Sequence, residues 1–183
     1  MALKSTVHRV ELQISDLDRH YYASHSLTLA QHPSETDARL MVRLMAFAMY
    51  AQERLEFGRG LSADDEPDLW LKSLTGEIEH WFELGQPEEA ALRRACGRAR
   101  RVTLIGYSGR AFDIWWEKNA AALARCGNLD VIALPAGTAE ALSGLLTRGM
   151  RLQCLVQEGE LQLMSETATV SATPTVLQAA TRG

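Results

Sequence analysis

The sequence predicts an α/β protein with a central mixed sheet flanked by helices and a β-hairpin at each end of the chain. Strand-like and helix-like segments alternate through the middle of the chain, a pattern typical of helices that cover a sheet. Both ends show pairs of strand-like segments joined by short turns. The 183 residues contain no internal repeat, low-complexity tract or long linker, so we expect a single domain over residues 1–183.

A hairpin and a long helix are predicted for the start of the chain. Residues 3–14 and 23–31 carry the strand patterns of a hairpin. Ser34, followed three residues later by Asp37, has the spacing of a helix N-cap. Apolar residues then recur at helical spacing as far as Leu55, so we expect a long helix with one buried face.

A loop and an acidic strand follow, and then helices and strands alternate. Gly and Asp residues at 58–69 predict the loop, and residues 77–84 have the strand pattern. Helix, strand, helix, strand, helix and hairpin follow at residues 87–101, 101–107, 108–123, 128–135, 138–149 and 150–165. Ser108 is the expected cap of the second of these helices, and the tail from Thr167 is expected to add one more strand. The two terminal hairpins either extend the central sheet or form a second one.

Composition excludes several classes of protein. The net charge of -4 and the pI of about 5.7 argue against a protein that is electrostatically attracted to nucleic acid as a whole. No apolar run approaches the roughly 20 residues that span a bilayer, and the N-terminus has no signal-peptide pattern. The three scattered cysteines, Cys96, Cys126 and Cys154, fit reduced thiols in a cytoplasmic protein.

Carboxylates gather around the strand at 77–84. Residues two apart on a strand share a face, so Glu79 and Glu83 lie on one face with Trp81, and the opposite, mostly apolar face is expected to point to the core. Asp68 lies upstream at a loop or strand end, and Glu35 lies in the expected first turn of the long helix. Oxygen ligands that converge from separate elements are what Mg²⁺ prefers.

A cluster of arginines follows this strand. Five of the 19 basic residues fall within nine positions: Arg93, Arg94, Arg98, Arg100 and Arg101. Arg94, Arg98 and Arg101 have the spacing of one helix face, so we expect a local cationic stripe on an otherwise acidic protein. Such a stripe is either a solvated helix face or a site for phosphate groups.

Several long motifs resemble one bacterial family. The segments "HPSETDARLMVRLMAFA", "DDEPDLW", "WFELGQPEE", "RRACGRA" and "IWWEKNAA" occur in the order found in the YaeQ family, and the resemblance covers nearly the whole chain. This resemblance implies a fold akin to the PD-(D/E)XK nuclease superfamily, with a restriction-endonuclease-like core. It does not imply a particular activity.

The resemblance also assigns expected roles to individual residues. The helix glutamate of the superfamily corresponds to Glu35, and its "PD" pair corresponds to Pro67 and Asp68. The strand glutamate of its "E-x-K" motif corresponds to Glu83, with Glu79 as the alternative, and Gly85 occupies the place of the lysine.

The missing lysine leaves the source of the basic group open. It is supplied by Arg94 or by Arg93 in the following helix, or the neutral Gln86 fills the space. Arginine stays protonated, so it stabilises charge but does not act as a base.

Two functions follow as expectations. The first is a Mg²⁺-dependent, nuclease-like protein in which Glu35, Asp68 and Glu83 hold the metal and Asp68, Glu83 and Arg94 act on phosphodiesters. Nucleic-acid contacts are expected from Arg93, Arg94, Arg98 and Arg101. The acidic net charge favours a structured or partial nucleic acid over bulk duplex. The alternative is a non-catalytic nucleic-acid-binding or regulatory module on the same scaffold.

Overall fold

The chain divides into two compact units, each built from two separate segments. The computed structural model describes residues 4–63 and 65–181, so the start of the first predicted strand and Asp64 of the acidic loop lie outside the described residues. Unit 1 combines Met1–Ala51 with Gly137–Thr173, and unit 2 combines Gln52–Ala136 with Pro174–Gly183. Each unit contains one mixed sheet.

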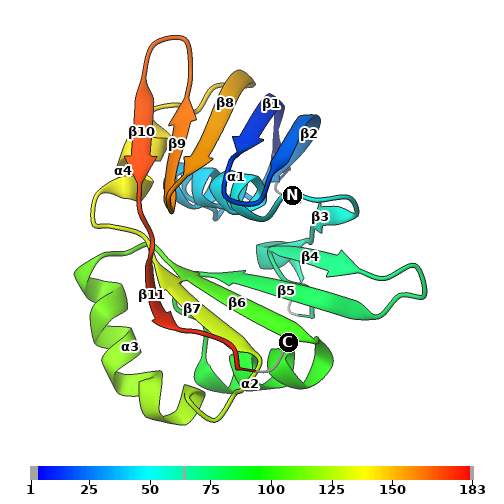
Figure 1. Ribbon diagram of the computed structural model, residues 1–183, viewed down its shortest axis with the longest axis vertical. Helices are drawn as coiled ribbons and strands as arrows, with labels where there is room; N and C mark the ends of the chain where they lie inside the picture. Colours follow the sequence, from blue (N-terminus) through cyan, green and yellow to red (C-terminus); the bar gives the residue numbers. More distant parts are fainter. Residues whose placement is uncertain (1–3, 64, 182–183) are drawn as a thin grey trace. The chain divides into compact units, whose positions relative to one another are not determined.

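Unit 1 is built on a five-stranded sheet with the order β10-β9-β8-β1-β2 (Figure 1). Its strands are β1 (Thr6–Asp16), β2 (Tyr21–Gln31), β8 (Gly149–Gln157), β9 (Glu160–Met164) and β10 (Thr169–Ala172). Strands β1 and β2 form the predicted N-terminal hairpin, and β8 and β9 form the predicted hairpin that turns at Glu158 and Gly159. Parallel pairing of β1 with β8 joins the two hairpins, so they form a second sheet rather than an extension of the central one.

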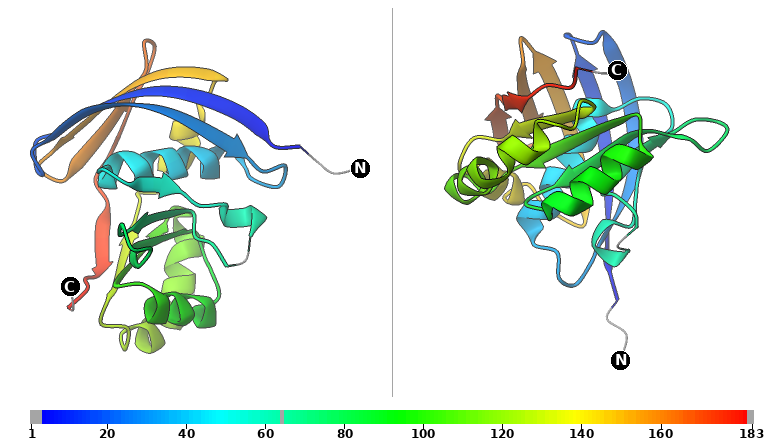
Figure 2. Two further views of the ribbon diagram at one scale, coloured as in Figure 1. Left: turned by 90° about the vertical axis from the view of Figure 1, so that its right-hand side faces the viewer. Right: turned by 90° about the horizontal axis from the view of Figure 1, so that it is seen from below.

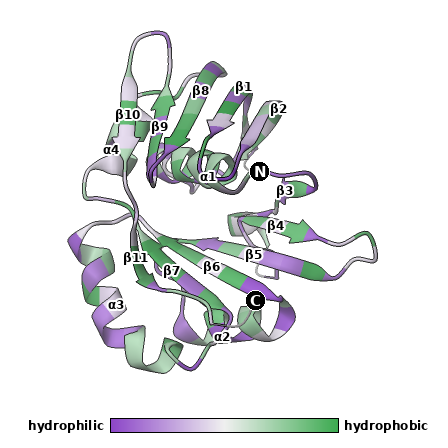
Figure 3. Cartoon of the chain, viewed as in Figure 1, coloured by the Kyte–Doolittle hydropathy of each residue, from purple (hydrophilic) through white to green (hydrophobic). Residues whose placement is uncertain are grey.

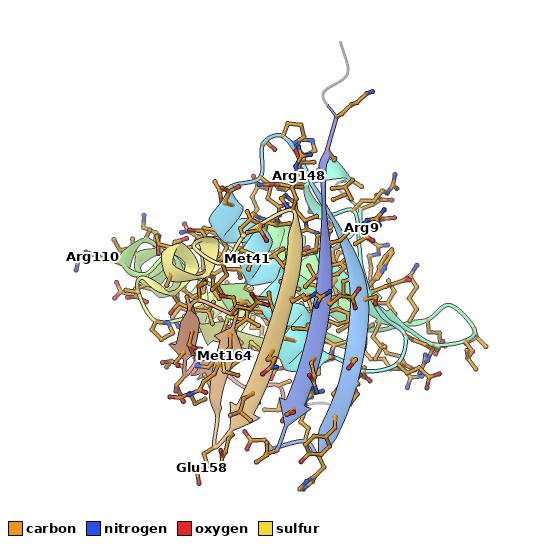
Figure 4. All side chains as sticks on the ribbon, turned by 90° about the horizontal axis from the view of Figure 1, so that it is seen from above. Arg9, Met41, Arg110, Arg148, Glu158 and Met164 are labelled. Atoms are coloured by element: carbon orange, nitrogen blue, oxygen red, sulfur yellow. The ribbon has the colours of Figure 1, made fainter. Side chains whose placement is uncertain are left out.

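Two helices, α1 (Asp37–Tyr50) and α4 (Thr138–Ser143), accompany this sheet, and Figure 2 shows α1 along one of its faces. Alternation along β1 explains the layering, because Val10, Leu12 and Ile14 point to the buried side. The residues between them are mostly exposed on the opposite face, which Figure 4 shows together with Arg9 and Arg148 at one end of the sheet.

Helix α1 differs from the prediction at both ends and in its burial. Its N-cap is Thr36, whose side chain accepts a hydrogen bond from the Arg39 backbone, so the predicted Ser34 cap is wrong and Glu35 precedes the helix. The helix ends at Tyr50 instead of continuing to Leu55. Every residue from 40 to 48 is buried, so the helix is not limited to the single buried face that the apolar spacing suggested.

Unit 2 is built on a six-stranded sheet with the order β11-β7-β6-β5-β4-β3. Its strands are β3 (Leu55–Phe57), β4 (Leu69–Lys72), β5 (Ile78–Leu84), β6 (Arg101–Gly106), β7 (Leu129–Ala133) and β11 (Thr175–Gln178). Strands β5, β6 and β7 are parallel, and the helices α2 (Glu89–Arg98) and α3 (Arg110–Leu123) connect them. This part confirms the predicted alternation of strands and helices.

Helices α2 and α3 pack on one face of this sheet. Their buried residues Leu92 and Phe112 form one hydrophobic cluster with Trp81 of β5 and Leu104 of β6. Figure 3 shows the mainly hydrophobic β6 and the mixed hydropathy along α3 that this packing requires. Trp81 shares a face of β5 with Glu79 and Glu83, so this acidic face packs toward the helices. The sequence pattern had predicted that the opposite face points to the core. Phe82 on that other face is also buried, so both faces of β5 are covered.

Several element ends in unit 2 differ from their predictions. The predicted Gly and Asp loop also contains the start of β4 and a short 3-10 helix (Gly60–Ser62). Helix α2 ends at Arg98, so Arg101 belongs to β6 and the predicted three-arginine stripe is shortened to Arg94 and Arg98. The N-cap of α3 is Gly109 instead of Ser108.

The C-terminal region also differs from its prediction. Helix α4 of unit 1 ends at Ser143, six residues before the predicted end at Gly149, which starts β8 instead. The tail contributes two strands, one to each sheet, instead of one. None of the helices in the described part of the chain combines the length and apolarity needed to cross a membrane.

His80 of β5 makes stability dependent on pH. Its Nε2 lies 2.7 Å from the Thr103 hydroxyl, and its ring stacks on Phe82 at 4.0 Å. Burial lowers the pKa of His80 from 6.5 to about 4, and the Arg101 charge adds to this effect while Asp130 opposes it. The unfolded chain therefore binds more protons than the folded one between these two values. We expect the contribution of neutral His80 to the free energy of unfolding to be complete above pH 6.5. The free energy of unfolding should fall by up to about 3 kcal/mol as the pH drops toward 4.

Urea unfolding at a series of pH values tests this expectation, with His80→Gln as the comparison. The variant should lose most of the pH dependence between pH 6.5 and 4. If the free energy of unfolding depends on pH equally in the variant and the parent chain, groups other than His80 cause the acid sensitivity.

Candidate functional site

Asp68 is held at the start of β4 by the backbone of two neighbouring segments. Its side chain is buried, and Oδ2 accepts a hydrogen bond of 3.1 Å from the Leu84 N–H at the end of β5. Its own N–H donates to the Phe82 carbonyl, and its carbonyl accepts from the Gly58 N–H, both at 3.1 Å. Asp68 is therefore fixed between the end of β3 and the end of β5.

Gly60 makes room for the Asp68 carboxylate. A Cβ atom at Gly60 would lie 2.6 Å from Asp68 Oδ1, and the φ angle of +48° is one that side-chain-bearing residues rarely adopt. A glycine is thus required where the backbone passes the carboxylate. The sequence analysis had not identified this contact.

Glu83 and Arg98 both contact the Trp81 ring. The indole Nε1–H donates to Glu83 Oε1 at 2.9 Å, and the Arg98 guanidinium lies over the ring at 4.9 Å from its centre. Arg98 also donates to the Asp65 carbonyl at 3.1 Å. Trp81 is buried in the cluster beneath α2, so a rigid aromatic ring positions one acidic and one basic side chain.

Of the two candidate acids on β5, Glu83 lies beside Asp68. The Asp68 carboxylate contacts the backbone of Leu84, the residue directly after Glu83. Glu79 lies four residues earlier, roughly 13 Å along a strand, and its carboxylate faces Arg54 at 3.9 Å. The Asp68 carboxylate thus lies against the backbone directly after Glu83 at one end of β5, and Glu79 lies four residues away.

Gly85 has a backbone conformation that disfavours a lysine, and it lies beside Tyr107. Its φ angle is +90°, and a Cβ atom there would lie 3.6 Å from Cε1 and 3.8 Å from the hydroxyl of Tyr107. Tyr107 follows β6, which runs parallel to β5, so both strands end at the same edge of the sheet. The sequence analysis had not considered Tyr107, although its position directly after a buried strand was a usable signal.

The other arginines are exposed and differ in whether they form ion pairs. Arg93 bonds to Glu89 one helical turn earlier at 2.7 Å, and Arg101 bonds to Asp130 of β7 at 2.6 Å. Arg94 is exposed and makes no ion pair with the residues that the structure describes. Because Arg94 and Arg98 are four residues apart on α2, they share a helix face.

Glu35 belongs to unit 1 and is held in a buried ion-pair network. Its Oε2 accepts from Arg39 at 2.7 Å and from Arg43 at 2.9 Å, and its Oε1 accepts from Arg43 at 2.8 Å. Glu35 is 6% exposed and Arg43 is 7% exposed. Both carboxylate oxygens are thus bonded to guanidinium groups.

The donors at the β5 end fit a hard cation that keeps most of its water. In the described part of the chain, no group of three or more His, Cys, Asp or Glu side chains is arranged to hold a metal ion. Mg²⁺ commonly uses only one or two carboxylates and completes its shell with water. Asp68 and Glu83 are the two carboxylate side chains at this end of β5 that could serve as such ligands.

Comparison with known proteins places the chain in a family. A family model described as YaeQ protein matches residues 1–174. The chain belongs to the YaeQ family. Two curated relatives carry the name "Uncharacterized protein YaeQ". The one from Salmonella typhi is 44% identical over 163 residues, covering 89% of this chain and 90% of the relative. The one from Escherichia coli K12 is 43% identical over 166 residues, covering 91% and 92%.

Two crystal structures of YaeQ proteins have the same fold. The protein from Xanthomonas axonopodis pv. citri has a TM-score of 0.93 and 57% identity, covering 96% of this chain and 99% of that one. The protein from Pseudomonas syringae has a TM-score of 0.89 and 35% identity, covering 96% and 97%. The mixed α/β fold with two mixed sheets is therefore a YaeQ fold.

Proposed function

We propose that this YaeQ-family protein binds the phosphodiester backbone of a structured nucleic acid at the end of β5. Asp68 and Glu83 hold Mg²⁺ there, and Arg94 and Arg98 contact phosphate groups. The proposal depends on one observation, that a single buried indole holds Glu83 on its N–H and Arg98 on its face. A carboxylate suited to a cation and a guanidinium suited to an anion are thus held by the same ring, which supports the proposal.

The chemistry of these groups suits a phosphodiester. Mg²⁺, when bound, neutralises phosphate charge and lowers the pKa of a coordinated water. Asp68 contributes a ligand fixed by backbone hydrogen bonds, and Glu83 contributes one whose rotamer is set by Trp81. Arg98 is oriented by the Asp65 carbonyl and the indole, and the exposed Arg94 extends the cationic face. The PD-(D/E)XK-like fold that the YaeQ motifs imply is part of this proposal, and it gives Asp68 and Glu83 the same roles.

Calorimetric titration of Mg²⁺ into the protein tests the metal site. We expect one binding event that is lost in Asp68→Asn and Glu83→Gln, because each change removes a charged ligand. Glu79→Gln is the matched control and should bind Mg²⁺ like the parent chain. If both ligand variants bind Mg²⁺ as well as the control does, the metal site is ruled out.

Nucleic-acid binding is measured separately with labelled hairpin RNA, branched DNA and plain duplex. The double variant Arg94→Glu and Arg98→Glu should weaken binding at least tenfold, and salt should weaken the parent complex steeply. Arg110→Glu, a charge reversal at an exposed position on α3, is the control. If the control and the double variant lose nucleic-acid affinity equally, the effect is one of overall charge and α2 carries no specific binding site.

A non-catalytic module is the second candidate, and Gly85 is the observation that favours it. The residue in the lysine position has a left-handed backbone conformation and faces the Tyr107 ring. Arg94 and Arg98 do not replace lysine as a proton acceptor, since arginine remains protonated. This candidate predicts that Asp68→Asn leaves nucleic-acid binding unchanged and that no substrate is cut. Mg²⁺-dependent cleavage that disappears in Asp68→Ala and Glu83→Ala would instead establish the nuclease.

A further inference from the structure

Two cysteines from different elements meet at the edge of the unit 2 core. Cys96 lies in the last turn of α2, and Cys126 lies in the turn after α3. Both are partly buried and pack on the same hydrophobic cluster. The chain separates them by 30 residues, so folding alone brings them together.

Asn128 fixes the backbone around this pair. Its side-chain amide donates to the Cys96 carbonyl at 2.9 Å and to the Ala99 carbonyl at 3.0 Å. The turn itself is closed by hydrogen bonds from Cys126 N–H to Leu123 and from Leu129 N–H to Cys126. The end of α2 and the turn after α3 are therefore held together independently of the thiols.

The Cys126 side chain also affects the pKa of the Cys96 thiol. Burial raises the pKa of Cys96 to about 12, and the neighbouring Cys126 side chain adds to this effect. Cys154 provides a contrast within the same chain. It is buried in unit 1, where burial and the Asp16 charge raise its pKa to about 12, and neither of the other cysteines belongs to that unit.

We propose that Cys96 and Cys126 form a dithiol site that peroxides oxidise to an intramolecular disulfide. One thiolate attacks hydrogen peroxide, breaking the O–O bond to give a sulfenic acid and hydroxide, which takes up a proton to become water. The second sulfur then attacks the sulfenic sulfur and displaces the second water. In total, two thiols lose two electrons and two hydrogens, and one peroxide becomes two waters. The bond links α2, the helix with Arg94 and Arg98, to the turn after α3.

Peptide mapping of the full chain after treatment with hydrogen peroxide tests the proposal. Free thiols are then blocked by alkylation before the chain is unfolded and digested. We expect one linked peptide pair that contains Cys96 and Cys126 and has lost two hydrogens, with Cys154 recovered alkylated after unfolding. Cys154→Ser should give the same link. Cys96→Ser and Cys126→Ser should give no intramolecular link.

Two further readouts separate a built site from chance oxidation. The rate should rise with pH between pH 7 and 9, because the thiolate is the reactive form and its fraction grows with pH. The disulfide should raise the unfolding temperature of unit 2 by roughly 10–20 °C, read from tryptophan fluorescence. Peroxide-treated native chain that keeps all three thiols at pH 9, or that links Cys154 or separate molecules instead, would overturn the proposal.

Discussion

Replacing Gly58 with alanine should lower the free energy of unfolding of unit 2 by about 3 kcal/mol. A Cβ atom at this position would lie 2.1 Å from the Pro67 carbonyl oxygen and 3.1 Å from the carbonyl carbon. Both are backbone atoms, so no side-chain rotation relieves the clash. The Gly58 N–H also donates to the Asp68 carbonyl, and moving this backbone therefore displaces the candidate metal ligand.

Urea unfolding followed by tryptophan fluorescence measures this change, because all four tryptophans lie in unit 2. Gly97→Ala is the matched control. Gly97 lies inside α2, and a Cβ atom there meets nothing within 4 Å, so alanine should stabilise the helix by roughly 0.5–1 kcal/mol. Opposite signs for the two glycine-to-alanine changes are the expected result. A Gly58 variant as stable as the parent chain would show that β3 and Pro67 separate at no cost.

Glu35→Ala should cost unit 1 about 3 kcal/mol, since it leaves the buried Arg43 guanidinium without its carboxylate. Arg43 also donates to the Ala30 carbonyl at 2.9 Å, which does not neutralise the charge. Far-UV circular dichroism is the suitable probe because the tryptophans report on unit 2 alone. Glu77→Ala, at the exposed pair with Arg100, should change stability by less than about 1 kcal/mol.

A double variant identifies the cause of the Glu35 effect. Glu35→Ala with Arg43→Met should recover part of the lost stability, because it removes the buried guanidinium that has lost the Glu35 carboxylate and keeps an apolar stem of similar length. A double variant less stable than Glu35→Ala would show that Arg43 contributes by packing. Calorimetry on the folded Glu35→Ala chain should still detect Mg²⁺ binding, since the proposed ligands are Asp68 and Glu83. Loss of that binding would assign a metal-ligand role to Glu35.

Local patterns in the sequence determined much of this fold. The hairpins at both ends and the strand-helix alternation from β5 to β7 follow from side-chain periodicity, which repeats over a few residues. The motifs were specific enough to indicate the YaeQ family. The predicted start of α1 was wrong because Ser34 and Thr36 are both good N-cap residues. The observed N-cap is the residue whose hydroxyl accepts a hydrogen bond from a free N–H of the first turn.

Only the tertiary structure decided which distant residues meet. Parallel pairing of β1 with β8 makes one sheet from hairpins at opposite ends of the chain, and no local pattern encodes that pairing. Contacts of Asp68 with Leu84, of Arg98 with Trp81 and of Asn128 with Cys96 likewise depend on packing between elements. Periodicity determines which face a side chain takes on its own element. Burial of apolar surface, which is non-directional, determines which elements then come together.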